Sequence, residues 1–154
     1  MTRAEQMQGH TVRFHMRTPD WNAFPDSSRE GYRRAQYRMI GRGGSQKNDP
    51  GAIPAEHFTL SIMYVGPGQG GPAHTHEVEE AFFMLQGHCI FFWVDEEGGR
   101  HEERLGPWDC VCYPADVPHG FHNDSPEGCY MQVMIGTGQP GRIGYQDKAL
   151  QALG

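Results

Sequence analysis

Three histidines and one glutamate near the middle of the chain have the residue types and the spacing of a metal site. His74 and His76 are separated by one residue, Glu80 follows shortly after them, and His119 comes much further along the chain. Because side chains alternate between the two faces of an extended strand, His74 and His76 can present both imidazoles to one ion. The apolar run behind Glu80 reads as the next strand, and a hairpin can return this carboxylate beside the histidines. The pattern predicts a mononuclear metal site inside a β-barrel.

The donor types narrow the choice of metal. Imidazole nitrogens together with a carboxylate oxygen suit iron, manganese, nickel or zinc. We therefore expect one divalent transition metal per chain, with Fe(II) as the first choice and Mn, Ni or Zn as alternatives. If the histidines merely packed in the core, each buried polar ring would need a hydrogen-bond partner of its own. Metal binding is the simpler explanation of their spacing.

The same residues resemble the first sequence motif of the cupin superfamily, G-x5-H-x-H-x3-E-x6-G. Its fixed positions are filled by Gly68, His74, His76, Glu80 and Gly87. The resemblance implies a double-stranded β-helix, which is a small jelly-roll barrel. It also implies that the metal ligands are His74, His76, Glu80 and His119.

Residues 108–123 resemble the second cupin motif, G-x5-P-x-G-x2-H-x3-N. Pro114, His119 and Asn123 match it, whereas Trp108 and Asp116 stand where the motif has glycine. Asp tolerates the left-handed backbone conformation better than most residues do, so we still expect a tight turn at Asp116.

Short runs of β-favouring residues alternate with turn signals from residue 57 onward, which is typical of a sandwich or barrel. With the resemblance, they predict an all-β jelly-roll (cupin) barrel with an N-terminal arm and a short C-terminal helix. We divide the chain into the arm at residues 1–56, part of the same domain, the barrel core at 57–136 and the tail at 137–154. The predicted strands are 34–40, 57–65, 80–85, 88–94, 110–113 and 130–135, with a surface loop at 41–51 and a helix at 146–153.

Strand alternation also ranks the side chains around the metal. Glu80, Phe82 and Met84 share one face of their strand, so Phe82 and Met84 are expected to line the cavity and Glu79 to point away from it. His122 also points away by this rule, with an acid–base role as its alternative. The further candidates for the substrate pocket are Tyr64, Trp108, Gln132 and Met134, and Tyr37 and Arg38 are candidates for the cavity or its rim.

Four protein ligands leave two adjacent positions on an octahedral ion, which is room for a substrate and dioxygen. With Fe(II), the leading hypothesis is a dioxygenase that cleaves a small enolisable, hydroxyketone or dihydroxy-aromatic substrate. Glu80 has two alternative catalytic roles, as a permanent ligand or as a carboxylate that leaves the metal to take a proton. One alternative function is a redox-neutral lyase, isomerase or decarboxylase with the same ligands, and another is a non-enzymatic cupin that binds a small ligand.

Composition limits the partners and the location. The chain has a formal net charge of -6 and no extended basic cluster, so we expect neither a nucleic-acid nor a membrane partner. Its first residues lack the apolar core of a secretory signal, which predicts a cytoplasmic protein. The four cysteines lie in apolar, strand-like contexts and are expected to be free thiols.

The arm predicts an oligomer. Its strand-like pieces, such as residues 11–14, are too polar to form a core of their own and are expected to pair with an open sheet edge. Cupins commonly exchange N-terminal strands, so the resemblance implies a homodimer.

Overall fold

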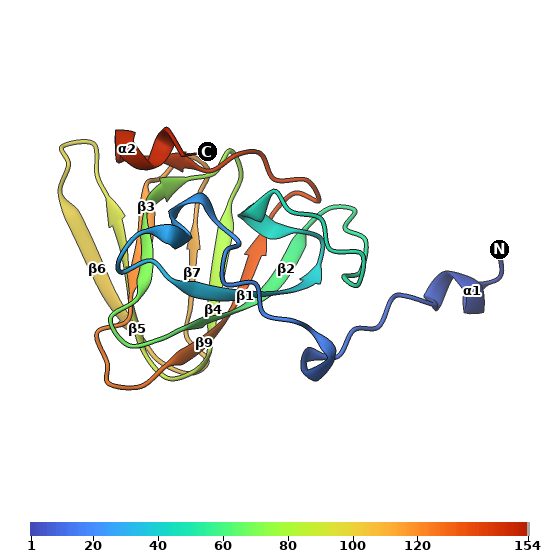
Figure 1. The fold of residues 1–154 in the computed structure, drawn as a ribbon. Helices are drawn as coiled ribbons and strands as arrows, with labels where there is room; N and C mark the ends of the chain where they lie inside the picture. The colour runs from blue at the N-terminus through green and yellow to red at the C-terminus, as the bar shows by residue number, and fades with distance from the viewer. Residues whose placement is uncertain (154) are drawn as a thin grey trace.

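A computed structural model describes residues 1–153, in which two antiparallel five-stranded sheets pack face to face (Figure 1). The first sheet has the strand order β1-β2-β9-β4-β7, and the second has the order β10-β3-β8-β5-β6. This is a jelly-roll barrel, as the sequence predicts. The strands are β1 (Arg34–Ile40), β2 (Thr59–Val65), β3 (Gly70–Thr75), β4 (Glu80–Gln86), β5 (Cys89–Val94), β6 (Arg100–Leu105), β7 (Cys110–Tyr113), β8 (His119–His122), β9 (Cys129–Ile135) and β10 (Gly144–Tyr145).

The helices are short and lie outside the sheets. In the described part of the chain, none is long and apolar enough to cross a membrane. The cytoplasmic location stays a prediction. The helices are α1 (Arg3–Met7), the 3-10 turns η1 (Phe14–Met16), η2 (Pro25–Ser28) and η3 (Gly43–Ser45), and α2 (Lys148–Gln151), which covers the middle of the predicted C-terminal helix.

The core lies between the two sheets. On β2, β4 and β9 every second residue is buried, as expected for strands with one face toward the core. Phe82, Phe91 and Met84 are among the largest side chains that are fully buried. All four cysteines are free, as the sequence predicts, and Cys89 and Cys129 are buried in this core.

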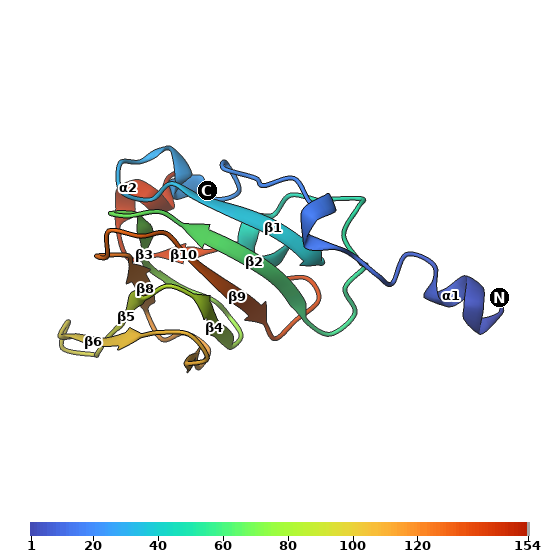
Figure 2. The same cartoon turned by 90° about the horizontal axis from the view of Figure 1, so that it is seen from below.

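The first sheet begins inside the segment that the sequence assigned to the arm. β1 pairs with β2 so that Arg34 lies opposite Val65 and Gln36 opposite Met63. The chain before η1 is different, because α1 and the residues around it project away from the barrel (Figures 1 and 2). The folded body therefore starts well before residue 57, and only the first part of the arm is free of it.

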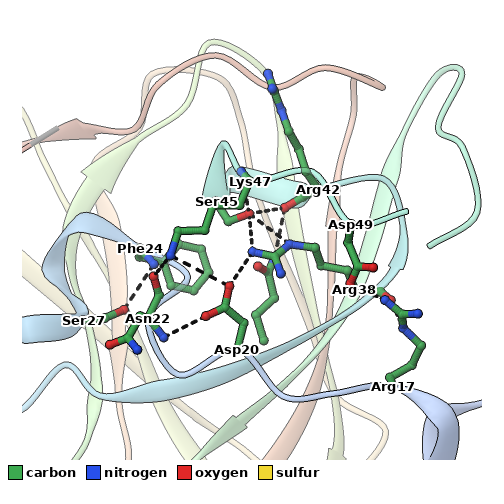
Figure 3. Close-up of polar contacts among 11 residues, drawn as sticks. Arg17, Asp20, Asn22, Phe24, Ser27, Arg38, Arg42, Ser45, Lys47 and Asp49 are labelled. Atoms are coloured by element: carbon green, nitrogen blue, oxygen red, sulfur yellow. Dashed lines mark hydrogen bonds and ion pairs between the residues drawn. The ribbon is translucent and has the colours of Figure 1, made fainter. Parts of the chain in front are cut away.

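A polar network joins the segment before β1 to the loop after it (Figure 3). Nη2 of Arg38 donates to Oδ2 of Asp20 at 2.8 Å and to Oγ of Ser45 at 2.9 Å. Arg17 pairs with Asp49 in the same network. These contacts hold η3 in place, so the loop predicted at residues 41–51 contains an ordered turn.

All of the predicted strands are present, with ends that shift by at most two residues. The strands β6 and β10 were not predicted from the sequence, and β6 is the longer of the two. Its residues Arg100–Glu103 are exposed and charged or polar, and it forms the edge of its sheet, so it lacks the alternation that marks a half-buried strand.

Candidate metal centre

Four buried side chains from both sheets meet inside the barrel. His74 lies on β3, His76 directly follows that strand, Glu80 begins β4 and His119 begins β8. Their exposed fractions are 6%, 5%, 5% and 1%, respectively. The pairing of β3 with β8 sets His74 opposite His119. One potential ligand atom from each residue lies within 4.8 Å of all the others, so this cluster could bind a metal ion.

The backbone fixes which nitrogen of two imidazoles faces the cluster. Nδ1 of His74 donates to the Pro72 carbonyl at 2.8 Å, and Nδ1 of His119 donates to the Val117 carbonyl at 2.7 Å. Because a carbonyl oxygen only accepts, each Nδ1 carries a proton, and in the neutral ring each Nε2 carries a lone pair. Such a second hydrogen bond is the usual support of a histidine that binds a metal through its other nitrogen.

The Nε2 atoms surround one oxygen of Glu80. Its Oε1 lies 3.3 Å from Nε2 of His74 and of His76, and 2.7 Å from Nε2 of His119. Lone pairs on buried nitrogen and oxygen atoms repel at these distances unless a cation lies between them. Several protons would place charged imidazoles against one another, whereas a single metal ion satisfies every donor. The residues present therefore fit a metal, and their donor set fits iron, manganese, nickel or zinc.

The pKa shifts of His74 and Glu80 agree with this reading, whereas despite the burial of its ring the Glu80 carboxylate raises the pKa of His76, so a metal would displace a proton there. Burial lowers the pKa of His74 more than the nearby Glu80 carboxylate raises it, so this ring stays neutral with a free Nε2. Burial would raise the pKa of Glu80, but the histidines, with His76 first, hold it well below its usual range. Metal ligands must be deprotonated, and both groups meet that condition.

Further contacts hold the ligands in position. The ring of Tyr113 stacks on His119, with centroids 4.1 Å apart and an interplanar angle of 15°. The backbone N–H of Asp116 donates to the His76 carbonyl at 2.9 Å. A Cβ atom at Gly44 would lie 3.3 Å from Cε1 of His76, so glycine allows η3 to lie close to this ring.

Both departures from the second cupin motif adopt a backbone conformation that suits glycine. The φ angle is 75° at Trp108 and 64° at Asp116, which places both in the left-handed region. The tight turn expected at Asp116 is therefore present. Trp108 is a bulky residue in this region and is 75% exposed.

The cluster faces a small cavity of about 20 Å³, which is room for one water-sized group. Gly44 and Ile143 line both this cavity and an outer depression of about 340 Å³, so they form the wall between the two. The apolar residues that line the inner cavity include Phe24, Phe82, Phe121, Val133 and Ile135. The polar residues that line it include Asp26, Arg34, Gln36, Thr59 and Ser61, and the guanidinium of Arg34 lies over the rings of Phe24 and Phe121.

The structure brings only part of the predicted pocket to this cavity. Phe82 lines it, whereas Met84 is buried on the same face of β4 without lining the cavity. Tyr64 lies on the partly exposed face of β2, opposite the buried face that carries Met63 and Val65. Trp108 is largely exposed, so neither Tyr64 nor Trp108 reaches the metal cluster.

Gln132 and Met134 also lie on the other side of the sheet, which corrects the face predicted for β9. In the pairing of β4 with β9, Glu80 is opposite Ile135 and Met134 is opposite Ala81. Because opposite residues share a face, the side of the sheet that carries Glu80 also carries Ile135 and excludes Met134. The sequence shows the alternation on β9 but not which of its two faces meets the core.

Glu79 and His122 follow their predicted faces. Glu79 is exposed, and His122 is exposed on β8 beyond the buried residues Gly120 and Phe121. The two rim candidates do not line the cavity, because Tyr37 lies on the partly exposed face of β1 and Arg38 is buried in the network of Figure 3.

The polar wall of the cavity was missed at the level of sequence. Arg34 and Gln36 are 3% and 1% exposed, and Asp26 is 1% exposed. The available signal was the alternation of long polar residues along the predicted strand 34–40. Such residues normally lie on the solvent face of an edge strand, so their alternation alone does not indicate a buried wall.

Residues 61–136, from β2 to the end of the first sheet's β9, match the Cupin domain family. The chain belongs to the cupin superfamily. The matched segment contains all the candidate ligands, so the family and the buried cluster point to the same region of this cupin.

Comparison with known proteins gives relatives of several kinds. This cupin is 34% identical over 87 residues to dimethylsulfoniopropionate lyase DddQ of Ruegeria pomeroyi, a match that covers 56% of this chain and 38% of the lyase. The chain thus matches well under two thirds of that relative's length.

Two solved structures share the fold. The polyketide cyclase RemF from Streptomyces resistomycificus has a TM-score of 0.69 and 20% identity, over 89% of this chain and 84% of that chain. A deletion mutant of oxalate decarboxylase OxdC from Bacillus subtilis has a TM-score of 0.65 and 18% identity, over 88% of this chain and 31% of that chain. All three named relatives are enzymes.

Proposed function

We propose that this cupin is a metal-dependent enzyme that carries out redox-neutral chemistry, such as elimination, isomerisation or decarboxylation, on a small carbonyl or carboxylate compound. The observation that carries the proposal is the contact of three Nε2 atoms with one buried carboxylate oxygen, which calls for a cation. A lyase, a cyclase and a decarboxylase among the similar proteins favour this class over the dioxygenase that the sequence ranked first.

The chain's own residues have distinct roles in this proposal. His74, His76, His119 and Glu80 would hold the metal. A bound divalent metal would act as a Lewis acid, polarising a substrate oxygen and lowering the pKa of the adjacent C–H or O–H group. Glu80 presents Oε1 to all of the histidines, which suits a permanent ligand better than a mobile base.

The cavity restricts the substrate. Its volume of about 20 Å³ holds one water-sized group, so a whole substrate requires a shift of the wall at Gly44 or Ile143. The aromatic and aliphatic residues of the cavity exclude bulk water from the reacting group. We therefore expect a substrate of few carbon atoms.

A dioxygenase is the second candidate, because the same ligand set suits Fe(II) enzymes that consume oxygen.

The test of the proposed function begins with metal content by elemental analysis, followed by loading with Fe, Mn, Ni or Zn. Small hydroxyketones, carboxylic acids and dimethylsulfoniopropionate are then screened by NMR beside an oxygen electrode. Conversion without oxygen uptake supports the proposal. Stoichiometric oxygen uptake would instead support the dioxygenase. If the metal-loaded protein converts none of these compounds, the remaining function is that of a ligand-binding cupin.

A further inference from the structure

The polar lining of the cavity contains hydrogen-bonding groups that metal binding does not use. Arg34 and Gln36 lie two residues apart on β1, and both side chains point from its buried face into the cavity that His74, His76 and Glu80 also line. Two buried atoms among them, Nε of Arg34 and Oε1 of Gln36, have no hydrogen-bond partner within the described residues. Buried polar groups are nearly always paired, so these atoms require an explanation.

Several hydrogen bonds fix the guanidinium of Arg34, but one of its N–H donors has no partner in residues 1–153. Its Nη1 and Nη2 donate to the two oxygens of Asp26, and Nη1 also donates to the Tyr32 carbonyl at 2.9 Å. The hydroxyl of Tyr145 donates to Oδ2 of Asp26 at 2.6 Å. Burial and the Asp26 carboxylate raise the pKa of Tyr145, so this phenol stays protonated. Asp26 therefore balances the charge of Arg34, while the Nε–H donor is left free.

Gln36 leaves an acceptor free where Arg34 leaves a donor free. Its Nε2 donates to the Arg42 carbonyl at 3.2 Å. A Cβ atom at Gly43 would lie 2.6 Å from this nitrogen, so the turn η3 packs directly against the amide. The amide nitrogen is thus engaged at η3, which also lines the cavity, and Oε1 is the acceptor left without a partner in the described part of the chain.

One free donor and one free acceptor select the group that would join them. A hydroxyl accepts one hydrogen bond and donates another, so it satisfies both atoms. A carboxylate offers no proton to Gln36, and the charge of Arg34 is already balanced by Asp26. A methyl group would leave both atoms unpaired. The cavity volume of about 20 Å³ also matches a single group of this size.

We propose that Arg34 and Gln36 form a hydroxyl-binding subsite beside the metal centre, which makes the substrate a small hydroxy acid or hydroxyketone. This assignment rests on the proposed function, since a metal at the His–Glu cluster would hold the carboxylate or carbonyl of the same molecule. Arg34 donates a hydrogen bond to the substrate hydroxyl through its Nε–H, and Gln36 accepts a hydrogen bond from that hydroxyl through Oε1.

Binding of matched probes to the metal-loaded protein tests the subsite without any turnover. Isothermal titration calorimetry should show that 3-hydroxypropionate binds at least about tenfold more tightly than propionate, because the analogue without a hydroxyl leaves buried groups unpaired. In Gln36→Leu this preference should fall to less than about twofold. Gln132→Leu is the matched control, since it makes the same change on the partly exposed face of β9 and should keep the preference.

Metal content and thermal melting of each variant establish that it is folded and loaded, and Gln36→Met replaces Gln36→Leu should the latter unfold. Equal affinity for the two probes in the unchanged protein, or no binding of either, would overturn the subsite. A preference that survives in both Gln36 variants would come from chelation by the metal alone and would overturn it too. Failure of the proposed function has a different readout, because it concerns conversion of substrate and not the ratio of two binding constants.

Discussion

At the scale of single residues, His119 offers the cleanest test of the metal centre. It is 1% exposed, its Nδ1 is fixed by a backbone carbonyl, and its Nε2 lies 2.7 Å from Oε1 of Glu80. His119→Ala should lower the metal content by about tenfold or more, because even the loss of groups that support a ligand weakens binding by 10–100-fold. His122→Ala is the control on the same strand, since His122 is exposed and should leave the metal content unchanged. Full metal content in His119→Ala would reject the assignment.

A second residue-scale prediction concerns the backbone at Trp108. Its φ of 75° is unfavourable for any residue with a Cβ atom. Trp108→Gly and Trp108→Ala both remove the ring from its contact with Phe83, but only glycine relieves the backbone. The free energy of unfolding should therefore be higher for the glycine variant by about 1 kcal/mol, measured by urea titration. Equal stabilities would mean that the turn relaxes without cost.

The candidate metal ligands and the polar residues of the cavity differ in how well the sequence predicts them. The ligands could be named because their types and spacing carry the information, and strand alternation then places Glu79 and His122 away from them. Arg34 and Gln36 could not be named, because their burial depends on Asp26 and on the turn η3, which come from other parts of the chain. Neutralisation of a buried charge by a residue of another element leaves no alternation or turn signal within the strand itself.

At the scale of elements, η3 lies against both the metal cluster and the polar wall, so the contacts that hold it affect the site. Asp20, Arg38 and Ser45 provide those contacts (Figure 3). Burial would raise the pKa of Asp20, but hydrogen bonds from Arg38 and from the Asn22 amide lower it below its usual value. The pair Asp20–Arg38 thus stabilises the fold only while Asp20 is ionised.

The free energy of unfolding should fall as Asp20 becomes protonated at low pH. Because the folded-state pKa of Asp20 is the lower one, its contribution is fully present above the unfolded value of about 3.9 and is lost as the pH falls through the folded value. Asp20→Asn should therefore be less stable than the unchanged protein at pH 6, and the gap should narrow at pH 3. Urea midpoints at both pH values measure this. A gap of constant size would show that the carboxylate charge is not what matters.

The elements also show why the strands could be predicted better than their faces. β1 and β7 were predicted with their exact ends, because alternation and turn residues are local signals. The buried face of β9 depends on its register with β4, in which Glu80 lies opposite Ile135. A strand with apolar residues on both sides, as in Met131 and Met134, has no sequence signal that decides this.

At the scale of the whole molecule, several predicted pocket residues that do not reach the cavity lie together on one surface. Tyr64, Gln132 and Met134 lie on the partly exposed face of the first sheet, where aromatic rings also gather. Tyr64 and Tyr130 have centroids 5.0 Å apart, and Phe14 packs on Tyr37 at 4.5 Å. Exposed apolar faces enriched in tyrosine are typical of protein–protein interfaces.

We predict that the expected homodimer forms through this surface. Residues 1–11 are exposed and project from the barrel (Figure 2). Phe14, which follows them, packs on the ring of Tyr37. A second copy that covers this face would give both the arm and the tyrosines a partner, so light scattering should report twice the chain mass of 17.3 kDa. Removal of residues 1–13 or the double change Tyr64→Asp and Tyr130→Asp should shift the protein toward a monomer. The truncation stops there because Asp26, which lies further along, holds Arg34. Trp93→Asp is the control, since it alters a comparable exposed aromatic residue on the other sheet and should leave the dimer intact. A monomer before any change, or a dimer that survives both changes, would remove this face from consideration.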